Sequence, residues 1–374
     1  MPKTVTSTCE IPLRTLNLYI LRKQFLLPES AATDVMQVTE HLLGLHAKRP
    51  QTPYLMLQAR LPDFSAQHLD DLLYQQRVLL RAHAMRGTVH MLPLSQYRMI
   101  LAATEDQLDG MYRRAFKHLD NMQAIIDAIL DAVQQQGALL IEEIMAALPL
   151  EVDSRDLYRL VNYLCTNGIL VKSTVKGTWR NSVYRYQLLT EWQPNIPNHD
   201  WDVLPAQAKL IEGYLFAYGP ATIDDIVWWT GLTKTKVKKG LNSLGENCVS
   251  VYFEALADDA YLLQDDYEAL VKWQPPDETQ ITFLPSFDAY VIAYIRRERL
   301  IDEVYYDLIF RGVAGIIEPV VLLDGRIIGT WKYAVDGDCV ATELFVQPKG
   351  IEDALHKASH KTAQFLELAD ASTQ

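Results

Sequence analysis

The chain has 374 residues, of which 49% are hydrophobic and 22% are charged, and its formal net charge is −12. A single hydrophobic core stops growing at roughly 250 to 300 residues, so this length predicts two to four domains. The composition is that of a globular protein, which excludes disordered and fibrous classes. The negative charge argues against a nucleic-acid partner only weakly, because local basic patches decide such binding.

Motifs for membranes, metals and nucleotides are absent from the sequence. No stretch approaches the roughly 20 apolar residues that span a bilayer, and residues 1–16 lack the apolar core of a secretory signal. The four cysteines, Cys9, Cys165, Cys248 and Cys339, show no metal-ligand spacing and read as reduced thiols. No phosphate-binding glycine loop occurs. We therefore expect a cytoplasmic protein without a membrane partner, a metal or a nucleotide cofactor.

Residues 15–76 predict several short helices, separated by Pro28, Pro50, Pro53 and Pro62. The segments "LLRAHAM" and "TVHMLPL" then alternate around residues 85–87, which predicts a β-hairpin. Helices followed by a hairpin are typical of a winged helix. We assign residues 1–118 to this first domain.

Residues 121–192 repeat that order. Ile125, Ile129 and Val133 form a helical apolar stripe that stops at Gly137, two further helical segments follow, and two strand-like runs flank the polar turn "KGTWRNS". Three short helices and a hairpin predict a winged helix, and we assign residues 119–200 to it.

Residues 204–270 show the same order again, which predicts a third winged helix over 201–272. Here "DIVWWTGLTKTKVKKGL" fits a helix-turn-helix with Gly231 at the turn and Thr233 as N-cap. Its lysines would face DNA phosphates in a DNA-binding protein, and in any other protein they would form a solvated helix face. These lysines are Lys234, Lys236, Lys238 and Lys239.

From about residue 273 the sequence changes to prolines and alternating strands. "LLDGRIIGTW" predicts an Asp-Gly hairpin, and a last helix is expected from Ile351. A small antiparallel β-barrel or sandwich would satisfy residues 273–374. The predicted fold class is α+β, with three tandem winged-helix domains followed by a β-barrel-like domain. Tandem winged helices favour DNA binding, because wing and recognition helix together match the duplex backbone and groove.

Several segments resemble the bacterial winged-helix DNA glycosylases of the azinomycin-resistance and crosslink-unhooking type. "LLGLHAKRPQTPYLMLQARLPDF" and "RVLLRAHAMRGTVHMLP" are similar to the start of that family, and "FLPSFDAYVIAYIRRERLI" and "EPVVLLDGRIIGTWKY" to its C-terminal domain. The resemblance implies a C-shaped protein that clamps double-stranded DNA, and we expect it to be a monomer associated with the nucleoid. It also implies hydrolysis of the N-glycosidic bond of N7-alkylated purines, bulky adducts and crosslinks included, without a metal.

The catalytic motif of that family is Gln, an apolar residue, then Gln or Asp, and this chain has His46-Ala47-Lys48 at the corresponding place. We predict that His46 positions or deprotonates the attacking water, because imidazole titrates near neutral pH. Lys48 either grips the phosphate beside the lesion or, if desolvated, attacks the sugar C1′ as a neutral amine. The alternative is structural: a His-x-Lys pair capping the end of a helix.

The hairpin supplies the remaining candidates. We predict that Arg86 contacts the DNA backbone or minor groove, with Thr88 beside it, and that His90 forms a pocket wall. In most proteins an arginine at such a hairpin tip would simply be exposed to solvent. Asp288 is expected to be buried or turn-forming, and the pair Trp228-Trp229 to be core packing.

The leading interpretation is a DNA glycosylase acting on alkylated purines. Because the motif differs, a second interpretation is a DNA-binding regulator or lesion sensor that has lost the chemistry. A third is a protein-interaction scaffold, which only the negative charge favours.

Overall fold

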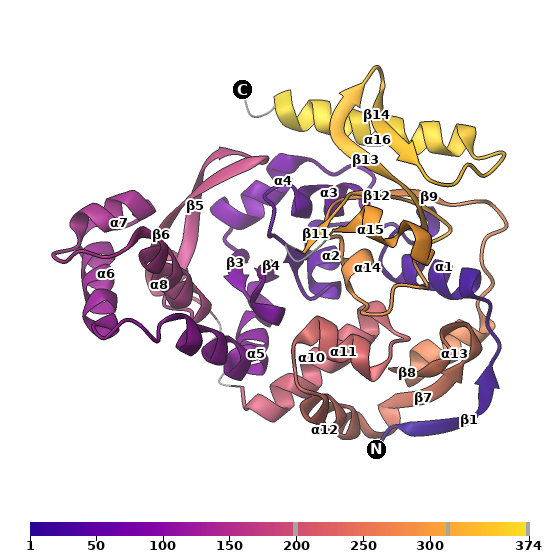
Figure 1. Cartoon of the computed structure of the whole chain (residues 1–374), viewed down its shortest axis with the longest axis horizontal. Helices are drawn as coiled ribbons and strands as arrows, with labels where there is room; N and C mark the ends of the chain where they lie inside the picture. Colours follow the sequence, from indigo (N-terminus) through magenta and orange to yellow (C-terminus); the bar gives the residue numbers. More distant parts are fainter. Residues whose placement is uncertain (197–200, 312–314, 372–374) are drawn as a thin grey trace.

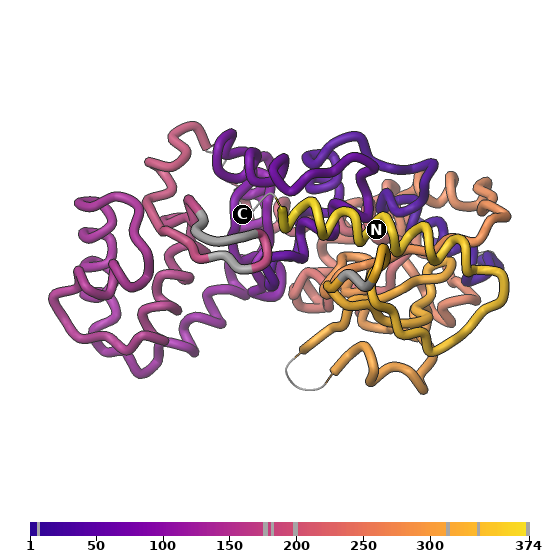
Figure 2. Tube along the Cα trace, turned by 90° about the horizontal axis from the view of Figure 1, so that it is seen from above, coloured from indigo at the N-terminus to yellow at the C-terminus, as the bar shows by residue number. Residues whose placement is uncertain are grey.

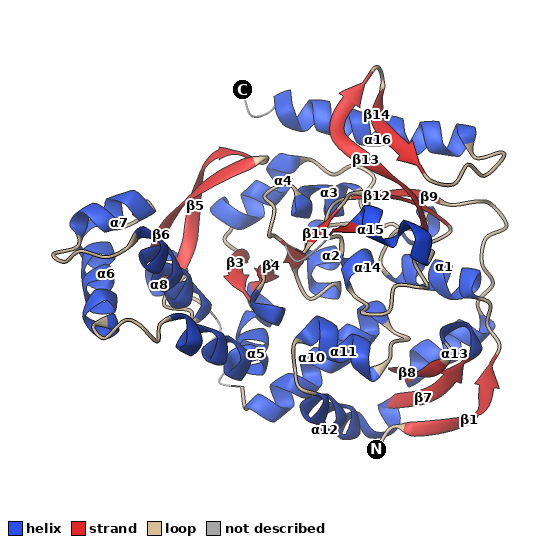
Figure 3. Cartoon of the chain, viewed as in Figure 1, coloured by secondary structure: helices blue, strands red, loops and turns tan. Residues whose placement is uncertain are grey.

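The computed structural model describes residues 1–196, 201–311 and 315–371, and along them runs of helices are followed by pairs of strands or small sheets (Figure 3). In the described residues every sheet is small, with four strands at most. No helix in this part of the chain is long and apolar enough to cross a membrane. The fold is a mixed α and β fold, in agreement with the prediction.

The N-terminal region contains short helices followed by a β-hairpin, as the sequence predicted. Its first strand was not predicted, and it pairs in parallel with a strand formed by Cys248–Phe253. A three-stranded sheet in the order β2-β4-β3 carries the hairpin. The elements are β1 (Lys3–Cys9), α1 (Leu13–Lys23), α2 (Val35–His41), β2 (Leu45–His46), α3 (Thr52–Gln58), α4 (Ala66–Asp70), β3 (Leu79–His83), β4 (Val89–Pro93) and α5 (Leu94–Ala115).

The second region has three helices and an antiparallel hairpin in the predicted order. Asp153 caps α8 by accepting hydrogen bonds from the backbone N–H groups of Arg155 and Asp156. The apolar faces of these helices pack into a hydrophobic core of their own, separate from the main one. The elements are α6 (Met122–Gln136), α7 (Ile141–Ala147), α8 (Ser154–Thr166), β5 (Leu170–Thr178), β6 (Asn181–Leu188) and α9 (Leu189–Trp192).

The third region repeats the order of helices and hairpin. Gly231 takes a left-handed conformation at the end of α11, with φ +76°, and Thr233 caps α12, so both predicted turn residues are confirmed. The elements are α10 (Val203–Tyr218), α11 (Ile223–Thr230), α12 (Lys234–Leu244), β7 (Cys248–Phe253), β8 (Asp258–Leu263) and α13 (Gln264–Lys272).

The C-terminal region holds an open four-stranded antiparallel sheet in the order β14-β13-β12-β9, so the predicted barrel-like closure is wrong for the described residues. Helix α16 packs against β9, β13 and β14 and covers the sheet, so further strands are not needed to bury its apolar face. The predicted hairpin turn is confirmed at Asp324 and Gly325, which both have positive φ. The elements are β9 (Ile281–Leu284), α14 (Ala289–Ile292), α15 (Tyr306–Ile309), β10 (Phe310–Arg311), β11 (Ile316–Ile317), β12 (Val320–Leu323), β13 (Arg326–Asp336), β14 (Cys339–Leu344) and α16 (Glu352–Ala371).

The regions are arranged around the β2-β4-β3 sheet. One main core joins the N-terminal helices, the third region and the C-terminal sheet, whereas the second region lies at one end of the long axis of the molecule (Figures 1 and 2). The β5–β6 hairpin reaches from that end to α16, where Arg180 donates two hydrogen bonds to the Asp370 carboxylate. The β2-β4-β3 sheet itself contacts the other three regions: β3 contacts β5 and α8, the hairpin turn contacts α11, and His46 of β2 stacks on Phe287.

Candidate functional site

His46 lies on a short strand and not at a helix end. Helix α2 ends at His41, and β2 pairs with β4 so that His46 lies directly opposite His90. Gly44 makes this pairing possible: its φ is +98°, and a Cβ there would lie 2.8 Å from the Met91 carbonyl oxygen. The alternative in which His46 and Lys48 cap a helix is therefore wrong.

The His46 ring is enclosed by two other rings. It stacks on Phe287 with centroids 5.0 Å apart and meets His90 edge-on at 5.4 Å. Only 6% of its surface is exposed, and its Nδ1 atom is buried with no hydrogen-bond partner among the described residues. Burial above all, and then the nearby His90, Lys48 and Arg86, hold the pKa of His46 well below its usual value of 6.5. His46 is consequently neutral at physiological pH.

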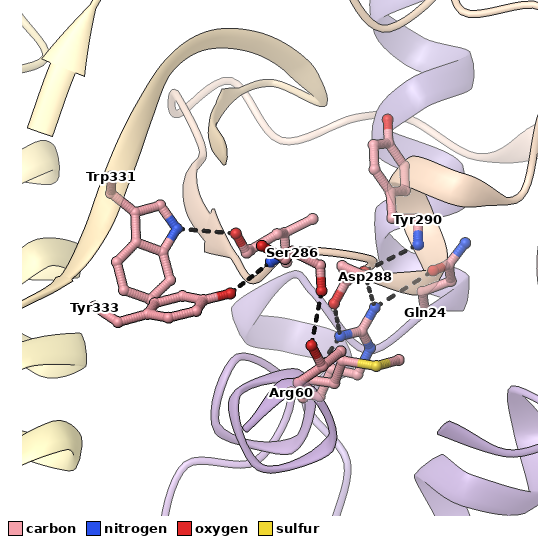
Figure 4. A network of polar contacts seen from close by, with 10 residues as sticks. Gln24, Arg60, Ser286, Asp288, Tyr290, Trp331 and Tyr333 are labelled. Carbon is pink, nitrogen blue, oxygen red and sulfur yellow. Dashed lines mark hydrogen bonds and ion pairs between the residues drawn. The ribbon is translucent and has the colours of Figure 1, made fainter. Parts of the chain in front are cut away.

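Phe287 is held in position by hydrogen bonds of the residues before and after it. The Ser286 N–H donates to the Tyr333 hydroxyl over 2.7 Å, and the Asp288 carboxylate accepts two hydrogen bonds of 2.8 Å from Arg60 (Figure 4). Phe287 has a φ of 62°, which is rare for a bulky residue and persists only where the surroundings hold it. Asp288 is fully buried, as the sequence predicted, and it acts through the loop that presents Phe287.

His90 is fixed as a neutral ring with a known proton position. Its Nδ1 lies 3.0 Å from the Thr88 carbonyl oxygen, which can only accept, so the proton is on Nδ1 and Nε2 carries a lone pair. Burial lowers the pKa of His90 to about 4, against the opposing effect of this hydrogen bond. The Thr88 hydroxyl donates to the Met85 carbonyl, so both residues stabilise the hairpin turn.

The mouth of the site carries positive charge. A cavity of about 400 Å³ is lined by His46, His90 and Phe287, and its basic lining residues are Lys48, Arg86, Arg297 and Arg311. No carboxylate lines this cavity among the described residues. Its inner surface is therefore cationic although the whole chain has a net charge of −12.

The two predicted cations differ in how they are held. Lys48 is exposed, with Nζ 5.0 Å from the centre of the Phe287 ring. Arg86 lies at the hairpin tip in a left-handed conformation, and its guanidinium carbon is 3.7 Å from the centre of the Trp228 ring. Such cation–π contacts orient a cation without neutralising it. Arg86 is therefore presented as a full positive charge.

Trp228 corrects the prediction of core packing for the tryptophan pair. Both tryptophans line the cavity, but Trp229 is buried and packs on Tyr214, whereas Trp228 is only partly buried, supports Arg86, and donates its indole N–H to the Ile292 carbonyl. Neighbouring residues on a helix point about 100° apart, and this spacing was the available signal that both could not enter one core.

The lysines of α12 do not join the cavity. Lys234 pairs with Asp224 and Lys236 with Asp106, while Lys238 and Lys239 are exposed. None of the four lines the cavity that contains His46. Their contact with DNA phosphates stays a prediction, separate from the chemistry at His46.

Residues that the sequence did not single out complete the site. Phe287 and the cations Arg297 and Arg311 all come from the C-terminal region, and the Arg297 guanidinium carbon lies 3.9 Å from the centre of the Phe310 ring. No local spacing connects these residues to His46, because they meet it only through the tertiary fold.

Comparisons with known proteins show what the chain as a whole is similar to. Residues 39–365 match the model of a family described as DNA glycosylase AlkZ-like. A protein of Streptomyces sahachiroi described as an interstrand DNA cross-link repair glycosylase is 28% identical over 280 residues, which cover 71% of this chain and 72% of that protein. The solved structure of the Streptomyces sahachiroi DNA glycosylase AlkZ is similar with a TM-score of 0.78 and 22% identity, over 96% of this chain and 98% of that one. The structural likeness concerns the fold.

Proposed function

The chain belongs to the DNA glycosylase AlkZ-like family, and on that premise we propose the lesion it acts on and the residues that act. The substrate is an N7-alkylated purine in double-stranded DNA, bulky adducts and crosslinks included, and the reaction is hydrolysis of its N-glycosidic bond. The observation that carries this proposal is the neutral His46 ring, whose Nδ1 atom has no hydrogen-bond partner among the described residues, in a cavity whose charged lining residues in the described part of the chain are all cationic.

An alkylated purine changes what the enzyme has to supply. Alkylation at N7 makes the base cationic, so it departs as a neutral leaving group and needs little acid catalysis. The remaining tasks are to hold a water against C1′ and to avoid adding positive charge beside the developing oxocarbenium ion. A neutral imidazole satisfies both.

His46 serves as the acceptor that orients this water. It accepts a hydrogen bond from the water but is a poor general base, because its pKa is lowered and a general base works best with a pKa near the working pH. The same low pKa keeps the ring uncharged and one nitrogen lone pair available. We therefore assign His46 to water positioning, with proton loss to solvent following attack, and the neutral His90 to the pocket wall.

Lys48 grips a backbone phosphate next to the lesion. The competing role, attack on C1′ as a neutral amine, needs a desolvated lysine, and Lys48 is exposed. An ammonium about 4 Å from the oxocarbenium would cost on the order of 4 kcal/mol at an effective dielectric near 20, which also favours a position at the mouth over one at the sugar. Arg86, with Thr88 beside it on the hairpin, contacts the backbone or the minor groove.

The domain division follows the same proposal. Residues 1–118, 119–200 and 201–272 form winged-helix domains and residues 273–374 a fourth domain, which together clamp the duplex as a C-shaped monomer. The recurring helix-and-hairpin order and the separate core of the second region support this division.

Release of base from a duplex containing N7-methylguanine tests the function. We expect the wild-type chain to release the base, and His46→Ala to lower the single-turnover rate by about 100-fold or more. Lys48→Ala is expected to weaken duplex binding with a smaller effect on the rate. Lys349→Ala removes an exposed lysine that does not line the cavity and serves as the control.

Two outcomes separate the alternatives. Binding to duplex DNA with a steep salt dependence but no base release would favour the DNA-binding protein that has lost the chemistry. A covalent adduct trapped by borohydride and absent in Lys48→Ala would instead make Lys48 the nucleophile.

A further inference from the structure

We propose that Asp338, Cys339 and His356 form a zinc site that ties the β13–β14 turn to helix α16. Their ligand atoms all lie within 4.8 Å of one another, and the His356 Nε2 is 3.6 Å from an Asp338 carboxylate oxygen. Donors bound to one tetrahedral zinc ion lie about 3.3 to 3.8 Å apart, given Zn–N, Zn–O and Zn–S bonds of about 2.0 to 2.3 Å. Small side-chain rotations therefore suffice to complete the site.

The surroundings hold the turn in place. His360, one helical turn after His356, has its Nδ1 2.8 Å from the Asp338 carbonyl oxygen, so this nitrogen carries the proton and donates. Its Nε2 accepts from the Gln364 amide over 3.0 Å. Both nitrogens of His360 are thus occupied. We assign it as a positioning residue that fixes the turn against α16, although its Nδ1 also lies 3.7 Å from the Asp338 carboxylate. The parallel His356 ring faces the same carboxylate and is the one assigned as a ligand.

The donor set selects the kind of metal. A thiolate together with an imidazole favours zinc and other late transition metals, whereas magnesium and calcium prefer oxygen ligands alone. Binding releases the thiol proton of Cys339 to solvent, and one thiolate, one carboxylate and a neutral imidazole balance the charge of Zn²⁺. Three protein ligands leave a fourth position for water.

The site would stiffen the helix that bridges the molecule. Near its start α16 carries His356, and near its end it carries Asp370, which accepts hydrogen bonds from Arg180 and Trp179 of the β5–β6 hairpin. Zinc would therefore anchor one end of a helix whose other end holds the second region. This role is structural and lies outside the cavity that contains His46.

Titration of the chelator-treated full chain tests the proposal. We expect one Zn²⁺ per chain by calorimetry, and Co²⁺ in its place should give a thiolate-to-metal charge-transfer band and the strong visible bands of a tetrahedral site. Cys339→Ser and His356→Ala should each weaken zinc binding at least tenfold, and Cys339→Ser should abolish the charge-transfer band. The other three cysteines are buried, so the band reports on Cys339.

The control is His118→Ala, which removes an exposed histidine that pairs with Asp156 elsewhere in the chain. It should bind zinc like the wild type. His360→Ala should weaken binding less than His356→Ala, and Zn²⁺ should raise the melting temperature of the wild type but not of Cys339→Ser. Equal zinc affinity in the wild type and Cys339→Ser, or a cobalt spectrum without the charge-transfer band, would overturn the proposal. All readouts are independent of base release.

Discussion

Asp288→Asn is the sharpest test of how the site is held together. Asp288 accepts two hydrogen bonds of 2.8 Å from Arg60, and neither side chain is exposed to solvent. It also accepts from the Tyr290 N–H over 2.9 Å at the start of α14. The substitution keeps the shape of the side chain but leaves the guanidinium of Arg60 as an unpaired buried charge.

The expected loss is large because of that remaining charge. Removing one partner of a buried ion pair costs about 3 to 5 kcal/mol, whereas an exposed pair contributes about 1 kcal/mol or less. Lys234 and Asp224 form such an exposed pair, with 58% and 51% of their side chains accessible, so Asp224→Asn is the matched control. Urea denaturation of both variants gives the difference in the free energy of unfolding.

A double variant distinguishes the loss of the Arg60–Asp288 ion pair from the cost of leaving Arg60 as an unpaired buried charge. Arg60→Met combined with Asp288→Asn should recover a large part of the lost stability, since no unpaired guanidinium remains. Under conditions where Asp288→Asn is fully folded, base release should also fall, because Phe287 then loses its fixed position against His46. A loss below about 1 kcal/mol in Asp288→Asn, equal to that of the control, would refute this reasoning.

Further predictions concern the hairpin and the cavity wall. The free energy of unfolding should fall as the pH drops from about 6.5 to about 4, because His90 is protonated in the unfolded chain but stays neutral in the folded chain, where its pKa is lowered to about 4. In urea denaturation this decline with pH should be shallower in His90→Gln. An unchanged slope would contradict a buried neutral ring. Gly44→Ala should cost about 2 kcal/mol or more and lower base release, since the φ of +98° and the close Met91 carbonyl forbid a Cβ; a variant as stable and active as the wild type would show that β2 can shift. Trp228→Ala should weaken duplex binding with a change in melting temperature of a few degrees, while Trp229→Ala should cost about 3 to 5 kcal/mol as a core deletion; equal effects of the two would mean that Trp228 is core after all. Arg86→Ala should weaken binding at an unchanged melting temperature, and normal affinity would remove the hairpin tip from the DNA interface.

Local signals in the sequence predicted most of the secondary structure. Gly137 ends a helix, Gly231 and Thr233 form the turn and cap of the helix-turn-helix, and the Asp324-Gly325 turn is present, because each depends on residues only a few positions apart. The family was recognisable for a similar reason, since its motifs are short runs of residues.

Contacts between distant segments were beyond such signals. The strand at Lys3–Cys9 pairs with a strand of the third region, and no local sequence pattern predicts which strand it pairs with. The prediction of a barrel-like domain was wrong because α16 covers the sheet. The sequence of a helix at the end of the chain does not indicate on which face of a sheet it packs.

The sequence by itself determined the order of the elements and the residue types at the site, because helix periods, caps and turns are encoded within one or two turns of chain. The tertiary structure decided the chemistry of those residues. His46 is neutral because Phe287 and His90 bury it and because Lys48 and Arg86 surround it, and these neighbours come from three segments of the chain. Burial and electrostatic environment are properties of the packed molecule, so they follow only from the fold.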